Sequence, residues 1–140
     1  LGYYRLVWPS VPYEPGEIRV RALDTEGNVL AEKMIRTADE PTQLRLETSR
    51  SGQTVFVTAS LLDREGNLCP NASDRIFFES TGKVLAADAG NPSSIEPFHT
   101  PDAMAFHGKC AAIIRSKELC SVRAFLERNG KIIAAEAEKI

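Results

Sequence analysis

The chain has 140 residues, of which 43% are hydrophobic and 26% charged, and its 17 basic and 19 acidic residues leave a net charge of −2 at pH 7. This composition is typical of a globular domain and excludes disordered, collagen-like and coiled-coil classes. The two signs of charge are interspersed, without the basic stripe of a nucleic-acid-binding surface, and no apolar run reaches the ~20 residues of a membrane-spanning helix. The length fits one domain, or one domain and part of another.

The start of the chain indicates a fragment. It begins with Leu1 rather than Met, and residues 1–8 (LGYYRLVW) resemble the middle of a strand. We therefore expect a piece of a longer protein, whose targeting signals lie outside this sequence.

A recurring turn is the most useful internal signal. Residues 23–29 (LDTEGNV) are repeated as residues 62–68 (LDREGNL), and a looser copy at residues 126–132 contains Asn129-Gly130. In each copy an apolar segment enters a polar turn with a glycine, which supplies the positive φ of a tight hairpin loop, and a second apolar segment follows. Three hairpins in so short a chain predict antiparallel sheet.

Alternating hydrophobicity predicts strands beside these turns. Residues 17–22 and 54–61 both alternate, and the apolar side chains at odd positions of the second segment are expected to point inward. Residues 132–139 are rich in Ala and Glu and also fit a helix, but the short Asn129-Gly130 link favours a strand hairpin. Further strands are expected at residues 43–47, 75–79, 83–87, 110–114, 122–126 and 132–137.

A polar segment around Pro41 divides the chain, because a proline pushes the residue before it into extended geometry. Residues 1–40 hold three or four expected strands, too few for a closed sandwich, and residues 41–140 hold seven or eight at sandwich-like spacing. We predict an all-β fold, with the last strands of a preceding β-sandwich domain in residues 1–40. Residues 41–140 are predicted to form an immunoglobulin-like antiparallel β-sandwich, in which the turn-rich segment 88–102 is an irregular crossing.

Three segments share their order and spacing with a known family: residues 11–18 (VPYEPGEI), 87–98 (ADAGNPSSIEPF) and 105–110 (AFHGKC). Together they resemble bacterial glycoside hydrolase family 2 proteins, the β-galactosidase-like enzymes that carry β-sandwich domains after a catalytic barrel. The resemblance covers nearly the whole chain. It departs at Asp88-Ala89-Gly90, where the family usually reads Asp-Asn-Gly, which leaves that turn's geometry open.

The resemblance implies that this part of the protein is non-catalytic. Two glutamates on the barrel act as acid/base and nucleophile in such retaining enzymes, and the barrel is absent from this chain. We therefore expect no catalytic residue, cofactor or metal here, and we expect the other domains of the parent enzyme as partners. The resemblance also suggests a periplasmic or extracellular bacterial parent.

Few side chains are candidates for chemistry. His99, His107 and Asp102 are the residues that acid–base or metal chemistry would use, but their pattern is typical of polar loop residues. The three cysteines at 69, 110 and 120 are odd in number and lack a CxxC spacing. They are predicted to be small buried thiols, with a Cys110–Cys120 bridge as the alternative.

An aromatic cluster near the start is the candidate glycan contact. Tyr3, Tyr4, Trp8 and Tyr13 would bind a pyranose if their rings were exposed; otherwise they would fill the core of the first unit or an interface between domains. Three functions remain open: an accessory structural part of a sugar-cleaving enzyme, a carbohydrate-binding module, and a bacterial immunoglobulin-like surface or adhesin domain.

Overall fold

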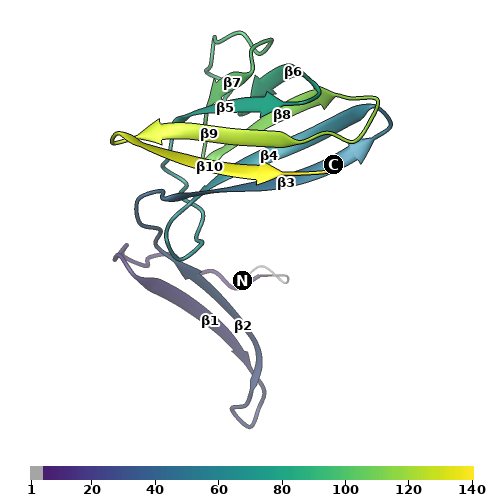
Figure 1. The fold of residues 1–140 in the computed structure, drawn as a ribbon. Coiled ribbons are helices and arrows are strands. Elements are labelled where there is room, and N and C mark those ends of the chain that lie inside the picture. The colour runs from purple at the N-terminus through teal and green to yellow at the C-terminus, as the bar shows by residue number, and fades with distance from the viewer. Residues whose placement is uncertain (1–4) are drawn as a thin grey trace. The chain divides into compact units, whose positions relative to one another are not determined.

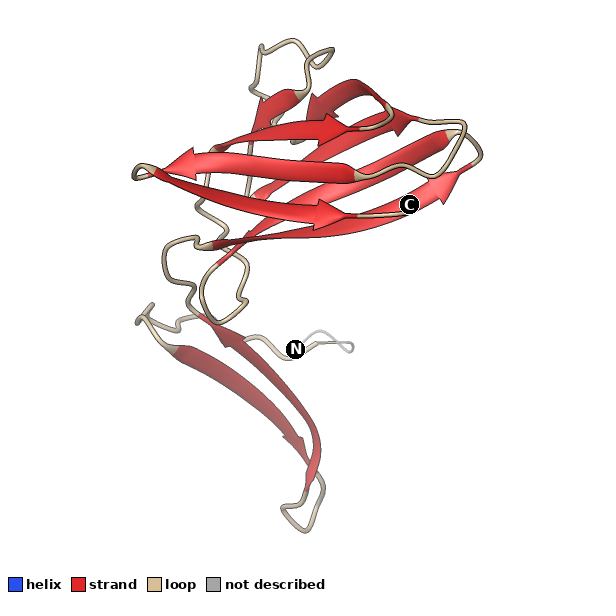
Figure 2. Cartoon of the chain, viewed as in Figure 1, coloured by secondary structure: helices blue, strands red, loops and turns tan. Residues whose placement is uncertain are grey.

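The computed structural model describes residues 5–140, and this part consists of strands and their connections (Figures 1 and 2). None of it forms a helix that could cross a bilayer. The predicted all-β class is confirmed. The chain divides into two compact units, Leu1–Thr37 and Ala38–Ile140.

The first unit is a β-hairpin of β1 (Glu17–Leu23) and β2 (Val29–Arg36), joined by the first copy of the repeated turn. Every position of both strands is exposed. One face carries a ladder of ion pairs, among them Arg36–Glu17 at 3.2 Å. The antiparallel register places apolar side chains on the opposite face, with Ile18 directly across from Ile35.

The expectation of three or four strands in this unit is wrong for its described residues, where only the hairpin forms. Residues 6–16 lie outside the strands, so the strand expected at residues 1–8 does not form over its last three residues. Three prolines, Pro9, Pro12 and Pro15, fall within residues 6–16, and each lacks the N–H that a strand ladder needs.

The second unit is a sandwich of two four-stranded antiparallel sheets. One sheet has the order β3-β4-β8-β6 and the other the order β10-β9-β5-β7 (Figure 1). Seven of these strands were predicted; β7, with three residues, was not. The bounds are β3 Gln43–Ser51, β4 Thr54–Leu62, β5 Arg75–Ser80, β6 Lys83–Asp88, β7 Asp102–Met104, β8 Lys109–Arg115, β9 Val122–Arg128 and β10 Lys131–Ala137.

The hydrophobic core lies between the two sheets. Alternation works as predicted in β4, where the inward positions are almost fully buried and an outward position, Phe56, is 45% exposed. The inner faces of β5, β8 and β9 complete the core, so burial of apolar area stabilises the unit. Its largest fully buried apolar side chains are Leu61, Ile76, Ile114, Leu126, Val55, Val57 and Val122.

The three predicted turns have two outcomes. The turns at 23–29 and 126–132 join paired strands, and in the latter Asn129 and Gly130 have φ of 52° and 72°, as a type I′ hairpin requires. The turn at 62–68 forms, but no hairpin follows, and Leu68 makes only a single bridge to Leu62. The ladder goes no further because β8 occupies this edge of β4: the Leu61 N–H donates to the Gly108 carbonyl at 2.8 Å, and Ser60 pairs with Lys109.

The predicted irregular crossing occupies residues 89–101, between β6 and β7. The Asn91 side chain accepts a hydrogen bond from the Ser93 N–H at 3.0 Å and fixes its first turn. Later in the segment, the Ala87 N–H donates to the Phe98 carbonyl at 2.9 Å. The crossing is therefore tied to β6 at Phe98, and the Asn91 bond holds its first turn internally.

The three cysteines are free and buried, so the predicted buried thiols are confirmed and the alternative Cys110–Cys120 bridge does not form. Burial raises the pKa of Cys69 and raises the pKa of Cys110 to about 12. These two thiols therefore stay protonated near neutral pH.

Candidate functional site

The aromatic residues predicted to contact glycan lie in the first unit. Trp8 is 59% exposed and Tyr13 is 74% exposed, both in the segment before β1. Tyr3 and Tyr4 lie outside the described residues. Neither Trp8 nor Tyr13 is buried within this chain, and both a glycan contact through these rings and their burial at an interface between domains stay predictions.

The candidate acid–base residues have separate surroundings. The His99 ring lies 4.4 Å from that of Phe98, measured between centroids, and His107 occupies the turn before β8 with a φ of 51°. The Asp102 carboxylate accepts a hydrogen bond from Arg75 at 2.6 Å. Among residues 5–140 no group of three or more His, Cys, Asp or Glu side chains is arranged to hold a metal ion.

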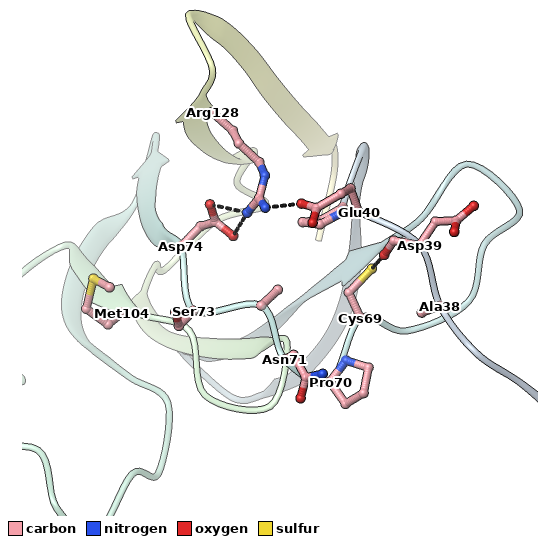
Figure 3. Close-up of a pocket in the computed structure, with 12 residues that line it drawn as sticks. Ala38, Asp39, Glu40, Cys69, Pro70, Asn71, Ser73, Asp74, Met104 and Arg128 are labelled. Carbon is pink, nitrogen blue, oxygen red and sulfur yellow. Dashed lines mark hydrogen bonds and ion pairs between the residues drawn. The ribbon is translucent and has the colours of Figure 1, made fainter. Parts of the chain in front are cut away.

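The largest cleft of the second unit lies where the chain enters the sandwich, and it encloses about 700 Å³ (Figure 3). Residues 38–41, residues 69–74, Met104 and Arg128 line it. It therefore combines the first residues of the unit with the connection between β4 and β5 and with the end of β9.

Arg128 dominates the electrostatics of this cleft. Its guanidinium donates to both carboxylate oxygens of Asp74, each at 2.7 Å, and it also pairs with Glu40 (Figure 3). Burial lowers the pKa of Arg128, but the hydrogen bonds and charges of Asp74 and Glu40 outweigh this and raise it overall. One cation thus pairs with two carboxylates of the cleft.

A second anchor holds Asp39. Its N–H donates to the Asp63 carboxylate at 3.1 Å, and its carbonyl oxygen accepts a hydrogen bond from the Cys69 thiol at 3.2 Å. Asp63 is 2% exposed, and its hydrogen bonds, first among them that from the Asn67 side chain, lower its pKa to about 2.

The chemistry of this cleft is structural. Asp74 and Glu40 are engaged by Arg128, and Asp63 is engaged by backbone and amide donors, so these carboxylates are poorly suited to general acid or base catalysis at neutral pH. What the arrangement does is fasten residues 38–41 to the sandwich.

Sequence reasoning missed Arg128, Asp74 and Glu40 as a group. Arg128 closes β9 and Asp74 precedes β5, and these two strands pair although the chain between them is long. No spacing along the chain signals the contact. It follows only from the strand order.

Comparison with known proteins identifies the fold's family. The family model of the glycoside hydrolase family 2 C-terminal domain 5 matches residues 40–130. The chain belongs to this family. The suspected resemblance to glycoside hydrolase family 2 is confirmed.

A curated relative, β-galactosidase BoGH2A of Bacteroides ovatus, is 40% identical over 114 residues, which cover 76% of this chain and 13% of the relative. The family 2 domain described here thus matches only a small share of a much longer protein.

Solved structures share the fold, among them one of a glycoside hydrolase family 2 member. A member from Bacteroides cellulosilyticus superposes with a TM-score of 0.76 at 20% identity, covering 94% of this chain and 19% of that one. A β-glycosidase from Bacteroides vulgatus gives a TM-score of 0.71 at 25% identity, covering 91% of this chain and 18% of that one.

Proposed function

We propose that this chain is a non-catalytic accessory part of a longer, β-galactosidase-like glycoside hydrolase, and that residues 41–140 stabilise that enzyme by packing against its other domains. The match of residues 40–130 to a family 2 C-terminal domain carries the proposal. The small share of the relative that the chain matches supports it. The family match is also the reason to prefer this role to that of a surface adhesin.

The structure of the second unit is consistent with a scaffold. Its core is complete between two sheets, and the carboxylates of its largest cleft are engaged in ion pairs and hydrogen bonds. In the parent, the acid/base and nucleophile would be supplied by a domain outside this sequence.

Two measurements test this proposal. The chain 1–140 should show no turnover of p-nitrophenyl β-D-galactopyranoside, whereas the longer protein should hydrolyse it. Removing residues 38–140 from the longer protein should lower its Tm or change its oligomeric state, and its turnover should fall. Hydrolysis by chain 1–140 alone, or a deletion that changes none of these quantities, would contradict the proposal.

For the first unit we propose that strands of a preceding β-sandwich domain in the longer protein cover the apolar face of the β1–β2 hairpin. An isolated two-stranded hairpin is at best marginally stable in water, and Ile18, Val20 and Ile35 on this face are 55%, 44% and 67% exposed. The ion pairs of the opposite face suit contact with water.

Amide hydrogen exchange tests the covering of the hairpin. The amides of β1 and β2 should exchange rapidly in chain 1–140 and become protected in the longer protein, whereas those of β4, which is central in its sheet, should be protected in both. Equally rapid exchange of β1 and β2 in the longer protein would overturn this proposal.

A further inference from the structure

A second cleft lies on the outer face of the β3-β4-β8-β6 sheet, away from the core, and encloses about 570 Å³. The strand register builds its floor. Asp88, Ala111 and Thr58 form one row across β6, β8 and β4, and Ala86 and Ile113 lie in the next row. Most of these side chains are small, which leaves a recess in the sheet face, and most of them are apolar.

The crossing segment supplies an aromatic wall. Phe98 lines the cleft and is 55% exposed, and the His99 ring packs beside it. Its backbone is fixed by the bond from Ala87, and the Thr100 hydroxyl, within 3.1 Å of the Pro97 carbonyl and 2.9 Å of the Asp102 carbonyl, shares its one hydrogen between them. The ring is thus held beside the floor before any ligand arrives, which reduces the entropy lost on binding.

Two side chains of opposite charge complete the lining. Asp88 accepts one hydrogen bond, from the N–H of Ala89 at 2.8 Å, and Lys109 occupies the row next to that of Asp88. Within the described residues neither side chain takes part in an ion pair. Both keep hydrogen-bonding capacity that a ligand could use.

This lining selects among ligand chemistries. A wholly apolar partner would bury Asp88 and Lys109 without hydrogen bonds, which is costly. An anion would meet Asp88, and a cation would meet Lys109, so a charged ligand gains from one and is repelled by the other. A neutral ring with hydroxyl groups satisfies both, since a hydroxyl donates to a carboxylate and accepts from an ammonium.

We propose that this outer-face cleft is a glycan-binding subsite for a neutral pyranose. One C–H face of the sugar lies against Phe98 and Ile113, and its hydroxyls bond Asp88, Lys109 and Thr58. Apolar packing with a few convergent polar groups is the usual composition of a small-ligand site. The accessory role proposed above requires no ligand, so this inference goes beyond it and places glycan contact away from Trp8 and Tyr13.

The test is a titration of ¹⁵N-labelled chain 1–140 with methyl β-D-galactopyranoside, followed by amide chemical shifts. Saturable shifts are expected at Asp88, Phe98, Lys109 and Ala111. Galactitol is the matched control ligand, because it carries hydroxyl groups on an open chain without the rigid face of the ring. It should bind at least severalfold more weakly. Equal binding of galactitol, or the absence of saturable shifts, would overturn the proposal.

Variants distinguish the contribution of the cleft to binding from that of the rest of the crossing segment. Phe98→Ala should weaken binding about fivefold or more, as expected for the loss of an aromatic contact. Phe98→Leu should retain part of the affinity, and Ile95→Ala, at a fully exposed position of the same segment, should leave it unchanged. Lys109→Met should weaken binding by about threefold or more, the size of one lost hydrogen bond.

The spectrum of each unliganded variant reports whether it folds. If Phe98→Ala does not fold, the loss of affinity is measured on Phe98→Leu instead. Equal affinity of the Phe98 and Ile95 variants would overturn the proposal. Shifts confined to the surroundings of Trp8 and Tyr13 would do the same. Neither result would bear on the accessory role, which the deletion experiment tests separately.

Discussion

The hairpin and the sandwich contain nearly the same turn in opposite surroundings. In the hairpin, the Asp24 carboxylate accepts hydrogen bonds from the N–H groups of Glu26 and Asn28, each at 2.8 Å, and from the Asn28 amide at 2.9 Å. In the sandwich, Asp63 receives the same three bonds from its own turn at 2.9 to 3.0 Å.

The surroundings differ although the turns do not. Asp24 is partly exposed in a unit whose strands are exposed at every position, whereas Asp63 is buried and also accepts the Asp39 N–H. The Asp-x-x-Gly-Asn sequence therefore encodes its turn locally, through the aspartate side chain and a glycine with positive φ. Whether that turn also contributes to the stability of a domain is decided by what packs around it.

Substitution of the matched leucines before the two turns should give the largest difference in the free energy of unfolding. Leu62 is 5% exposed and Leu23 is 55% exposed. Leu62→Ala should lower the free energy of unfolding by about 2–4 kcal/mol, because it removes buried apolar area and leaves a cavity, and Leu23→Ala should lower it by less than ~0.5 kcal/mol. Urea unfolding followed by circular dichroism measures both. Comparable losses would show that the hairpin has a core of its own.

Removal of the aspartates should have the next largest effect. Asp63→Ala removes a buried acceptor from the N–H donors of residues 39, 65 and 67, and we expect the Tm to fall by roughly 5–10 °C. Water can replace the acceptor in Asp24→Ala, so its Tm should change by only about 1 °C. Thermal unfolding of the two variants gives both changes in Tm. Equal changes would mean that the burial of Asp63 adds little to the stability of the sandwich.

Acid should separate the two turns as well. Because the folded-state pKa of Asp63 is lowered to about 2, its contribution to stability is complete above its unfolded value near 4 and is lost as the pH falls toward 2. Asp63→Asn should flatten this decline relative to the unmodified chain. Hydrogen bonds lower the pKa of Asp24 as well, but Asp24 belongs to the hairpin unit, so Asp24→Asn should leave the acid decline of the sandwich nearly unchanged. Urea midpoints between pH 5 and pH 2 give the comparison. A decline that Asp63→Asn does not alter would assign acid sensitivity to other carboxylates.

The glycines should give the smallest and most equal effects. Gly27 and Gly66 have φ of 88° and 86°, and a Cβ at either position would meet nothing within 4 Å. Gly27→Ala and Gly66→Ala should therefore each cost about 1 kcal/mol of local stability from backbone strain alone. Hydrogen exchange of the Asn28 and Asn67 backbone amides measures the loss of local stability in each of the two turns separately. A much larger cost at Gly66 would mean that the buried turn tolerates strain less well.

Most of the sandwich could be predicted from the sequence, because alternation and turn signals are local. β7 could not, since three residues are too few to show a period and its pairing with β5 depends on the crossing segment. The missing hairpin after residue 62 follows from the pairing of β4 with β8, a contact between distant segments that the similarity of the two turns does not reveal.

The sites were harder to predict than the strands. The outer-face cleft joins side chains from β4, β6 and β8 through a strand order that does not follow the chain, and the Arg128 group depends on the pairing of β5 with β9. The sequence indicated the aromatic residues 8 and 13 as candidates, but it placed Trp8 in a strand that does not form, and it could not reveal that Phe98 would line a cleft on the outer sheet face.

The buried thiols make this chain convenient for site-specific labelling. All three cysteines are shielded, and Cys110 is thiolate only near pH 12, so a maleimide reagent at neutral pH has little to attack in the folded protein. A cysteine introduced at the fully exposed position Ile95 would then be the reactive one, without removal of any native cysteine. A fluorophore there would sit on the same crossing segment as Phe98 and could report on its environment during folding and binding.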